Sequence, residues 1–311
     1  MSGLLDCVVV GAGPAGLSAG LYLHRYRRQV LLVDHGHSRA LGIASTRNFP
    51  GFPDGIAGHE LLARMRRQLA AVQGAVRHSE ATGLERAADG TFRLQLGPQV
   101  VGARTVLLAT GVVDVVPTLP GIQDVQRRGL LRQCPICDGY EHGDLRIAVL
   151  GDGTHAQREL RFITQYSARS VGVGVAAVPG PVAGATTLAA PAVRVELADA
   201  AVRLHLRDGS THDCDVLYAA MGVRPRVSLA AALQPEVNVL GNLLVDAACR
   251  TNVPGLYAAG DVVGGLDQLT VAVGHGAVAA TAIHNSLPLQ VRAPLAPVDP
   301  PGAVPGTVPA R

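Results

Sequence analysis

The sequence predicts an α/β fold with two doubly wound units, each a parallel sheet flanked by helices. Two segments carry this prediction, residues 4–28 and 146–166, because each runs from an apolar strand through a glycine-rich turn into a helix. Short apolar runs that supply the remaining strands follow at residues 106–111, 215–221 and 255–261. With 311 residues, the chain is long enough to bury a core in both units.

The composition excludes several classes of protein. Hydrophobic residues make up 48% of the chain and charged residues 16%, which argues against disorder. The net charge of +3 and the 3% of aromatic residues argue against a nucleic-acid partner. No lysine is present, so Schiff-base chemistry is excluded. The charge-free run at 170–193 contains several prolines and predicts no membrane span; the cytoplasm is the expected compartment.

The first glycine turn has the context of a dinucleotide-binding motif. A buried strand over Leu4–Val10 precedes it, a helix is expected over Leu17–Arg28, and a second strand over Gln29–Val33 ends at an acid. In this Rossmann-like arrangement the glycines permit a tight turn, the approach of a pyrophosphate and helix packing, while the acid accepts from a ribose hydroxyl. The cofactor-binding residues predicted here are Gly11, Gly13, Pro14, Ala15, Gly16 and Asp34.

Between the two glycine turns the sequence predicts a helix, a β-meander and a linker. The helix is expected over 58–72, and alternating apolar positions over 76–104 predict a meander with an Asp-Gly hairpin turn at 89–90. Asn48, in the loop before the helix, is either a cofactor ligand or an ordinary turn residue. Prolines and a glycine at 117–121 mark the linker.

The second glycine turn looks like a nucleotide site without its ligand contacts. Its candidate nucleotide-binding residues are Gly151, Gly153, Thr154 and His155. Asp152 places a carboxylate in the turn that would receive a phosphate. A strand is expected over 171–178, and no charged residue or histidine occurs from 170 to 193, where the ribose 2′ group of NADH or NADPH would be recognised. The sequence therefore argues against NADPH and leaves open whether the site is empty, remodelled or filled by a second flavin.

Two of the five cysteines, Cys134 and Cys137, form a C-x-x-C pair, and Asp138 follows directly. Such a pair in a chain of this type is more often redox-active than structural, and the acid can hand protons to a leaving thiolate. Zinc is the alternative, with His142 as a third ligand, but no fourth ligand stands at the usual spacing and no metal is predicted. The remaining cysteines stand alone and are expected to be structural.

The last third of the chain predicts a second hairpin sheet, a strand and a helix. Residues 194–218 alternate between polar and apolar around an Asp-Gly turn. A strand ends at Asp261, and a helix with small apolar residues on all sides, and hence buried, is expected over 268–285. The Pro-rich segment 288–311 is expected to be a disordered or loosely docked tail.

Over residues 4–287 these motifs together resemble those of the low-molecular-weight thioredoxin reductases. The motifs that carry the resemblance are Gly11-Ala12-Gly13-Pro14-Ala15-Gly16, Asn48-Phe49-Pro50-Gly51, Ala109-Thr110-Gly111, Cys134-Pro135-Ile136-Cys137-Asp138-Gly139 and Ala259-Gly260-Asp261. The resemblance implies a homodimer in which residues 1–116 and 244–287 form an FAD domain and residues 117–243 an inserted domain. It implies FAD contacts, besides those of the first turn, from Asn48, Thr110, Gly111, Gly260, Asp261, Gln268, Leu269 and Thr270.

The resemblance also implies roles for the redox residues. Cys137 would face the flavin and form the charge-transfer thiolate, Cys134 would attack the partner, and Asp138 would be the acid–base residue. A helix that begins after Gly139 is expected to activate the thiolate. The NADPH enzymes of the family carry a basic cluster where this chain has the uncharged residues 171–175, so the chain is predicted to be an atypical member.

The predicted function is that of an FAD-dependent disulfide oxidoreductase. It would pass electrons between the flavin and the Cys134/Cys137 pair to a protein disulfide such as that of thioredoxin, with ferredoxin or a second flavin as donor in place of NADPH. Two other functions stay open. One is a flavin-dependent dithiol oxidase that passes electrons from small-molecule or protein thiols to oxygen; the other is a non-catalytic flavoprotein that senses redox state.

Overall fold

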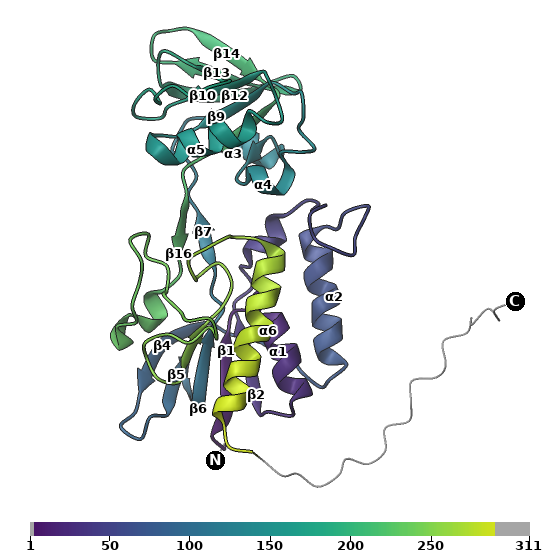
Figure 1. Ribbon diagram of the computed structural model, residues 1–311, viewed down its shortest axis with the longest axis vertical. Coiled ribbons are helices and arrows are strands. Elements are labelled where there is room, and N and C mark those ends of the chain that lie inside the picture. Colours follow the sequence, from purple (N-terminus) through teal and green to yellow (C-terminus); the bar gives the residue numbers. More distant parts are fainter. Residues whose placement is uncertain (1–2, 290–311) are drawn as a thin grey trace, which may run out of the picture.

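The computed structural model of the protein describes residues 3–289, which form two bodies joined by a narrow connection (Figure 1). Within this range the first body holds a seven-stranded sheet of order β3-β2-β1-β6-β5-β4, with β17 beside β6. Its strands are β1 (Leu5–Val10), β2 (Val30–Asp34), β3 (Val76–His78), β4 (Ala81–Arg86), β5 (Phe92–Leu96), β6 (Gln99–Leu108) and β17 (Leu256–Ala258).

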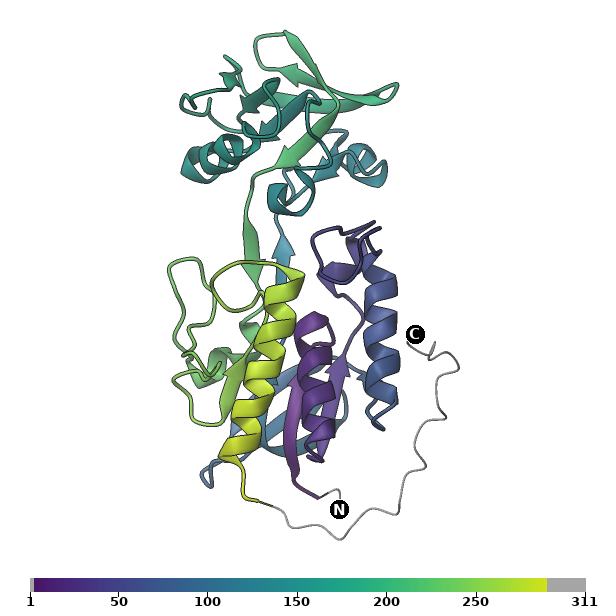
Figure 2. The ribbon, with the colours of Figure 1, turned by 45° about the vertical axis from the view of Figure 1, so that its right-hand side comes forward.

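Helices α1 (Pro14–Arg25), α2 (Gly58–Ala70) and α6 (Leu269–Ser286) stand side by side against this sheet (Figures 1 and 2). Small residues let α6 approach α1: a Cβ at Gly276 would lie 2.3 Å from the carbonyl oxygen of Ala15. The expectation that α6 is buried on all sides is wrong, because Val278 on its other face is 42% exposed. The small residues of α6 thus permit close packing against α1 on one face of the helix only.

The meander is shorter than expected, because its first segment joins the parallel part of the sheet. β3 pairs in parallel with β2, with Val76 opposite Leu32. The antiparallel meander is β4-β5-β6, and its hairpin turn lies at the expected Asp-Gly pair, where Gly90 has a φ of +85°. The ten-residue β6 serves both parts, since its last residues pair in parallel with β1.

The second body holds a five-stranded parallel sheet of order β11-β10-β9-β15-β8 and a three-stranded antiparallel sheet β12-β13-β14, counted over the described residues. Its strands are β8 (Leu131–Arg132), β9 (Ile147–Leu150), β10 (Ser170–Val173), β11 (Thr186–Thr187), β12 (Ala192–Ala198), β13 (Ala201–Leu206), β14 (Thr211–Cys214) and β15 (Val216–Ala219). Its helices are α3 (Ile122–Arg127), α4 (Pro135–Asp138) and α5 (Gly153–Ile163). A mixed sheet with a parallel half in the first body and a parallel sheet in the second, both with flanking helices, confirm the predicted α/β fold.

The connection between the bodies is a two-stranded antiparallel ladder of β7 (Val112–Asp114) and β16 (Val223–Pro225). After β16 the chain forms η2 (Ser228–Leu233), whose Ala230 is buried in the core of the first body together with Leu243. The boundary at residue 243 stays a prediction, and these contacts favour an earlier end of the inserted unit, near β16.

Two further predictions concern the charge-free run and the Pro-rich tail. The charge-free run at 170–193 contains β10 and β11, and none of the helices between residues 3 and 289 has the length and apolar character to cross a membrane. The Pro-rich tail lies outside the described residues from residue 290 on.

Candidate active site

Cys134 and Cys137 form a disulfide with an S–S distance of 2.10 Å at the one-turn helix α4. The Cys134 carbonyl accepts a hydrogen bond from the Cys137 N–H at 3.0 Å, and this turn brings the two sulfurs together. Pro135 suits the first helical position, because that position needs no N–H donor. The pair predicted from the C-x-x-C spacing is confirmed as a disulfide.

The helix expected after Gly139 does not form. Gly139 closes α4 instead, donating its N–H to the Pro135 carbonyl at 2.8 Å. A Cβ at this position would lie 2.6 Å from the same carbonyl oxygen, so a glycine is needed for the tight turn. The short helix at the cysteines therefore begins between them and not after them.

The disulfide lies on the wall of a cavity of about 500 Å³, where the carboxyl ends of β1, β2 and β6 meet the second body. This is the edge at which doubly wound folds bind nucleotides. The predicted FAD ligands on its wall are Gly11, Gly13, Pro14, Ala15, Asp34, Asn48, Thr110, Gly111, Gly260, Asp261, Gln268 and Leu269, together with Cys134, Cys137 and Asp138. Gly16 is buried behind the wall, and Thr270 is exposed.

The first glycine turn fits a diphosphate. Gly11 has a φ of +102°, and a Cβ there would lie 2.2 Å from the Ala109 carbonyl oxygen. A Cβ at Gly13 would meet only the Ser38 hydroxyl, at 3.3 Å, so a ligand can approach the backbone closely. α1 starts at Pro14 and has no acidic residue in its first turn, which leaves the positive end of the helix available to an anion.

Asp34 holds the glycine turn from the end of β2. Its Oδ1 accepts from the Ala12 N–H at 3.1 Å and its Oδ2 from the Gly36 N–H at 2.9 Å. An ionised carboxylate has about four lone-pair sites, so Asp34 keeps the capacity to accept from a ribose hydroxyl as well. The carboxylate thus fits the position predicted from the spacing of the motif.

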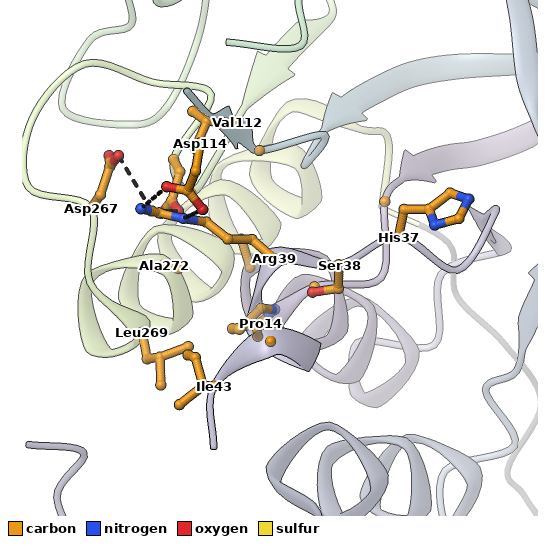
Figure 3. A pocket seen from close by; sticks show the side chains of 18 of the residues that line it. Pro14, His37, Ser38, Arg39, Ile43, Val112, Asp114, Asp267, Leu269 and Ala272 are labelled. Atoms are coloured by element: carbon orange, nitrogen blue, oxygen red, sulfur yellow. Dashed lines mark hydrogen bonds and ion pairs between the residues drawn. The ribbon is translucent and has the colours of Figure 1, made fainter. Parts of the chain in front are cut away.

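A salt-bridge cluster around Arg39 also lies on the cavity wall, and sequence reasoning missed it (Figure 3). Arg39 donates to Asp114 at 2.6 and 3.1 Å and to Asp261 at 3.1 Å, and its guanidinium lies 3.6 Å from Asp267. The single guanidinium of Arg39 therefore lies close to three carboxylates. Burial raises the pKa of Asp261, and burial together with the nearby Asp261 raises the pKa of Asp267 to about 6.

We expect Asp267→Asn to stabilise the protein by roughly 1–3 kcal/mol at pH 7.5 and to have little effect near pH 3.5. The folded-state pKa lies above the ordinary value of 3.8, so the charged carboxylate opposes folding above pH about 6. That cost shrinks as the pH falls below the folded-state pKa, and it is lost only below the ordinary value of 3.8. Urea unfolding at the two pH values measures it, with the exposed Asp54→Asn as control. An equal gain at both pH values would contradict this electrostatic origin.

Gln268 connects the disulfide to the first body. Its Nε2 lies 3.5 Å from the sulfur of Cys134 and from that of Cys137. Its Oε1 accepts from the Nδ2 of Asn48 at 3.0 Å, and the same Nδ2 lies 3.3 Å from the Ile136 carbonyl oxygen. Three loops, those before α2, α4 and α6, meet at this point. Asn48 therefore contacts the redox loop itself, while its role as a cofactor ligand stays a prediction.

Asp138 is held by two donors from the second body. Its Oδ2 accepts from Arg132 Nε at 2.6 Å and its Oδ1 from the Tyr218 hydroxyl at 2.6 Å. The same hydroxyl lies 2.7 Å from Nδ1 of His142, the residue considered above as a zinc ligand. Across residues 3–289, no three His, Cys, Asp or Glu side chains are grouped to hold a metal ion.

In the second glycine turn the carboxylate of Asp152 binds the loop that follows β10. It accepts from three consecutive N–H groups in the loop after β10, those of Val175 at 2.9 Å, Ala176 at 3.0 Å and Ala177 at 3.3 Å. The carboxylate expected in this turn is thus paired with the next loop, whose backbone donors would otherwise be unpaired. Backbone N–H groups after β10, at the ribose end of a Rossmann-like site, are thus paired within the protein.

The two glycine turns use opposite arrangements of the same parts. In the first body, the acid at the end of the second strand, Asp34, accepts from the N–H of Ala12 in the turn. In the second body, the acid stands in the turn at the position equivalent to Ala12, and the donors lie after the second strand. His155, also predicted for this site, pairs with Glu159 at 3.0 Å, and this hydrogen bond raises its pKa. The His155 side chain is thus paired with Glu159, one turn further along α5.

The other cysteines are buried and unreactive. Burial raises the pKa of Cys7 and of Cys214 to about 12 and that of Cys249 to about 11. These residues stay protonated thiols at neutral pH, and thiols are poor nucleophiles. The structure thus separates one reactive pair from three structural cysteines, as far as the described residues show.

Residues 5–159 and 186–276 match the family model described as pyridine nucleotide-disulphide oxidoreductase. The thioredoxin reductase of Treponema pallidum is 30% identical over 89% of this chain and 95% of its own length. Among solved structures, the thioredoxin reductase of Streptococcus pyogenes has a TM-score of 0.81 at 23% identity, covering 92% of this chain and 98% of that one. The atypical thioredoxin reductase TRi of Desulfovibrio vulgaris is 32% identical, covering 91% and 99%, with a TM-score of 0.52.

The fold, the disulfide and the cavity define a flavin disulfide oxidoreductase. The chain belongs to the pyridine nucleotide-disulphide oxidoreductase family and, within it, to the low-molecular-weight thioredoxin reductases. Membership implies FAD as the cofactor, and the glycine turn, Asp34 and the apolar wall of Ile43 and Leu269 fit that molecule (Figure 3).

Proposed function

We propose that this enzyme reduces a protein disulfide of the thioredoxin type through Cys134 and Cys137. The observation that carries the proposal is the position of the pair on the wall of the cavity that fits FAD, with the Gln268 amide 3.5 Å from both sulfurs. Bound FAD supplies two-electron transfer to the pair. Cys137 faces the cofactor, Cys134 attacks the partner disulfide, and Asp138 moves the proton of the exchange.

The surroundings of the pair support a protein partner. Ile136, between the two cysteines, is 47% exposed, and Tyr140, just after α4, is 82% exposed. Exposed apolar side chains beside a reactive group can make the contact area that a protein partner needs. A thioredoxin-like protein, with its disulfide at the surface, is the partner of this chemistry.

We further propose that the electrons do not come from NADPH. The loop after β10 carries no positive charge for a 2′-phosphate, and the carboxylate of Asp152 already binds its N–H groups. A relative that is 32% identical is itself described as an atypical thioredoxin reductase, which supports an atypical donor here. Reduced ferredoxin or a second flavin are the donors we propose.

Anaerobic reduction followed by flavin absorbance tests the donor. We expect NADPH and NADH to leave the flavin oxidised for minutes, while dithiothreitol or reduced ferredoxin bleaches it. Bleaching within seconds by NADPH would overturn the proposal on the donor, and about two flavins per chain would identify a second flavin. With air admitted, steady oxygen consumption with a dithiol, and none with ferredoxin, would favour the dithiol oxidase.

We also propose a cytoplasmic homodimer, on the strength of the motif resemblance described above. Analytical ultracentrifugation of the FAD-loaded protein tests the dimer. A mass of twice the 32.1 kDa chain is expected, and a monomer at micromolar concentration would contradict the proposal.

A further inference from the structure

A chain of hydrogen bonds leads from Asp138 toward solvent, and no motif pointed to it. Tyr218 lies in β15 directly opposite Arg132 of β8, so both side chains meet at Asp138. Tyr218 is fully buried, while the side chain of His142 is 21% exposed. A buried tyrosine hydroxyl needs partners, and this one has two, Asp138 Oδ1 at 2.6 Å and His142 Nδ1 at 2.7 Å.

The partners fix the direction of every hydrogen in this chain. Asp138 receives from Arg132 as well as from Tyr218, and a carboxylate only accepts. The Tyr218 hydroxyl therefore donates to Asp138, and its oxygen is left to accept from His142. This assigns the proton of the neutral His142 ring to Nδ1 and leaves Nε2 free to take another proton. In both hydrogen bonds of the chain, from His142 to Tyr218 and from Tyr218 to Asp138, the donated hydrogen thus points toward Asp138.

We propose that Tyr218 and His142 form a proton relay that reloads Asp138, which deepens the function proposed above and rests on it. When the Cys134 thiolate attacks a partner disulfide, one S–S bond forms, one breaks, and the departing thiolate takes a proton from protonated Asp138, which leaves the Asp138 carboxylate described above. The Tyr218 hydroxyl then passes its proton to Asp138 Oδ1 and takes the Nδ1 proton of His142. His142 takes one proton from water at Nε2. One proton moves in and no charge stays on Tyr218.

The electrostatic environment suits a relay in which tyrosine never ionises. Burial, and then the charge of Asp138, raise the pKa of Tyr218. Burial lowers the pKa of His142; Arg132 acts in the same direction, while Asp138 and Glu141 oppose it. His142 is thus a neutral ring at neutral pH, able to give one proton and accept another. These are the charged groups that face His142. Tyr218 and His142 act through Asp138 and are positioning residues.

The test is the anaerobic oxidation of the dithionite-reduced, FAD-loaded enzyme by oxidised thioredoxin, followed by flavin absorbance in stopped flow, in which the relay runs inward. Tyr218→Phe keeps the buried ring and is expected to slow this oxidation by about tenfold to a hundredfold. His142→Ala is expected to be slowed similarly and to recover with added imidazole, whereas Tyr218→Phe/His142→Ala gains nothing from imidazole. Tyr257→Phe, a buried tyrosine of the first body outside this network, serves as control and is expected to react like the wild type.

The outcomes separate a relay from a purely structural contact. If the two residues form a relay, imidazole restores the rate of His142→Ala only when Tyr218 is present. A change in solvent access caused by the loss of the His142 ring would not make the rescue depend on Tyr218. A wild-type rate in Tyr218→Phe, or a slow His142→Ala that imidazole does not restore, would overturn the relay while the proposed function stands. Flavin absorbance and the unfolding temperature establish that each variant is folded. A reduced wild-type enzyme that oxidised thioredoxin cannot reoxidise would remove the proposed function, and the relay with it.

Discussion

Cys137→Ser is expected to lower turnover with a disulfide substrate by about a thousandfold or more, while the protein keeps its FAD. The serine hydroxyl has nearly the shape of the thiol, but it cannot form with Cys134 the disulfide that is reduced to a dithiol by two electrons. The Cys137 side chain lies on the cavity wall, and a serine of nearly the same size leaves the shape of the cavity unchanged. Turnover and flavin per chain, measured on the same sample, separate lost chemistry from lost cofactor.

Cys214→Ala is the matched control, since it removes a thiol that burial keeps protonated, with a pKa of about 12. It is expected to cost about 1–2 kcal/mol of stability through the small cavity it leaves, with normal turnover. Cys134→Ser should be as inactive as Cys137→Ser. A Cys134→Ser enzyme with wild-type turnover would sink the catalytic proposal and favour the redox sensor, in which the pair alters a complex and not a rate.

The parts of this protein that sequence reasoning predicted are those whose signal is local. The first glycine turn needs Gly11 at a positive φ and a strand directly before it, and both are visible within a dozen residues. The redox pair needs only the spacing of Cys134 and Cys137. Hairpins at Asp-Gly turns follow the same rule, because the turn residue and the flanking alternation are adjacent in the chain.

The parts that were missed depend on contacts between distant segments. Arg39 forms ion pairs with Asp114 and Asp261, which lie 75 and 222 positions further along the chain. No pattern in the sequence near Arg39 predicts either contact. The carboxylate of Asp152 turns to a loop 23 positions ahead, because backbone N–H groups lie unpaired there. One signal was present for Tyr218: a hydroxyl in an otherwise apolar buried strand requires a partner. The partner itself could only come from the fold.

Gly16→Ala is expected to destabilise the protein by about 3 kcal/mol and to weaken FAD binding at least tenfold. A Cβ at this position would lie 1.8 Å from the carbonyl oxygen of Gly11, a backbone atom of the turn that faces the cavity. No side chain can move aside to make room, so α1 must shift or the turn must open. Urea unfolding of the apoprotein and FAD titration measure the two effects separately.

Gly274→Ala tests whether geometry or helix composition decides the result. Gly274 lies within α6, as Gly16 lies within α1, but nothing stands within 4 Å of its Cβ position. Alanine there is expected to stabilise the protein by about 0.5–1 kcal/mol, because glycine loses more backbone entropy in a helix. The same substitution thus has opposite signs at the two positions. A stable Gly16→Ala apoprotein that fails only to bind FAD would show that the turn can open, and that the close packing serves the cofactor and not the fold.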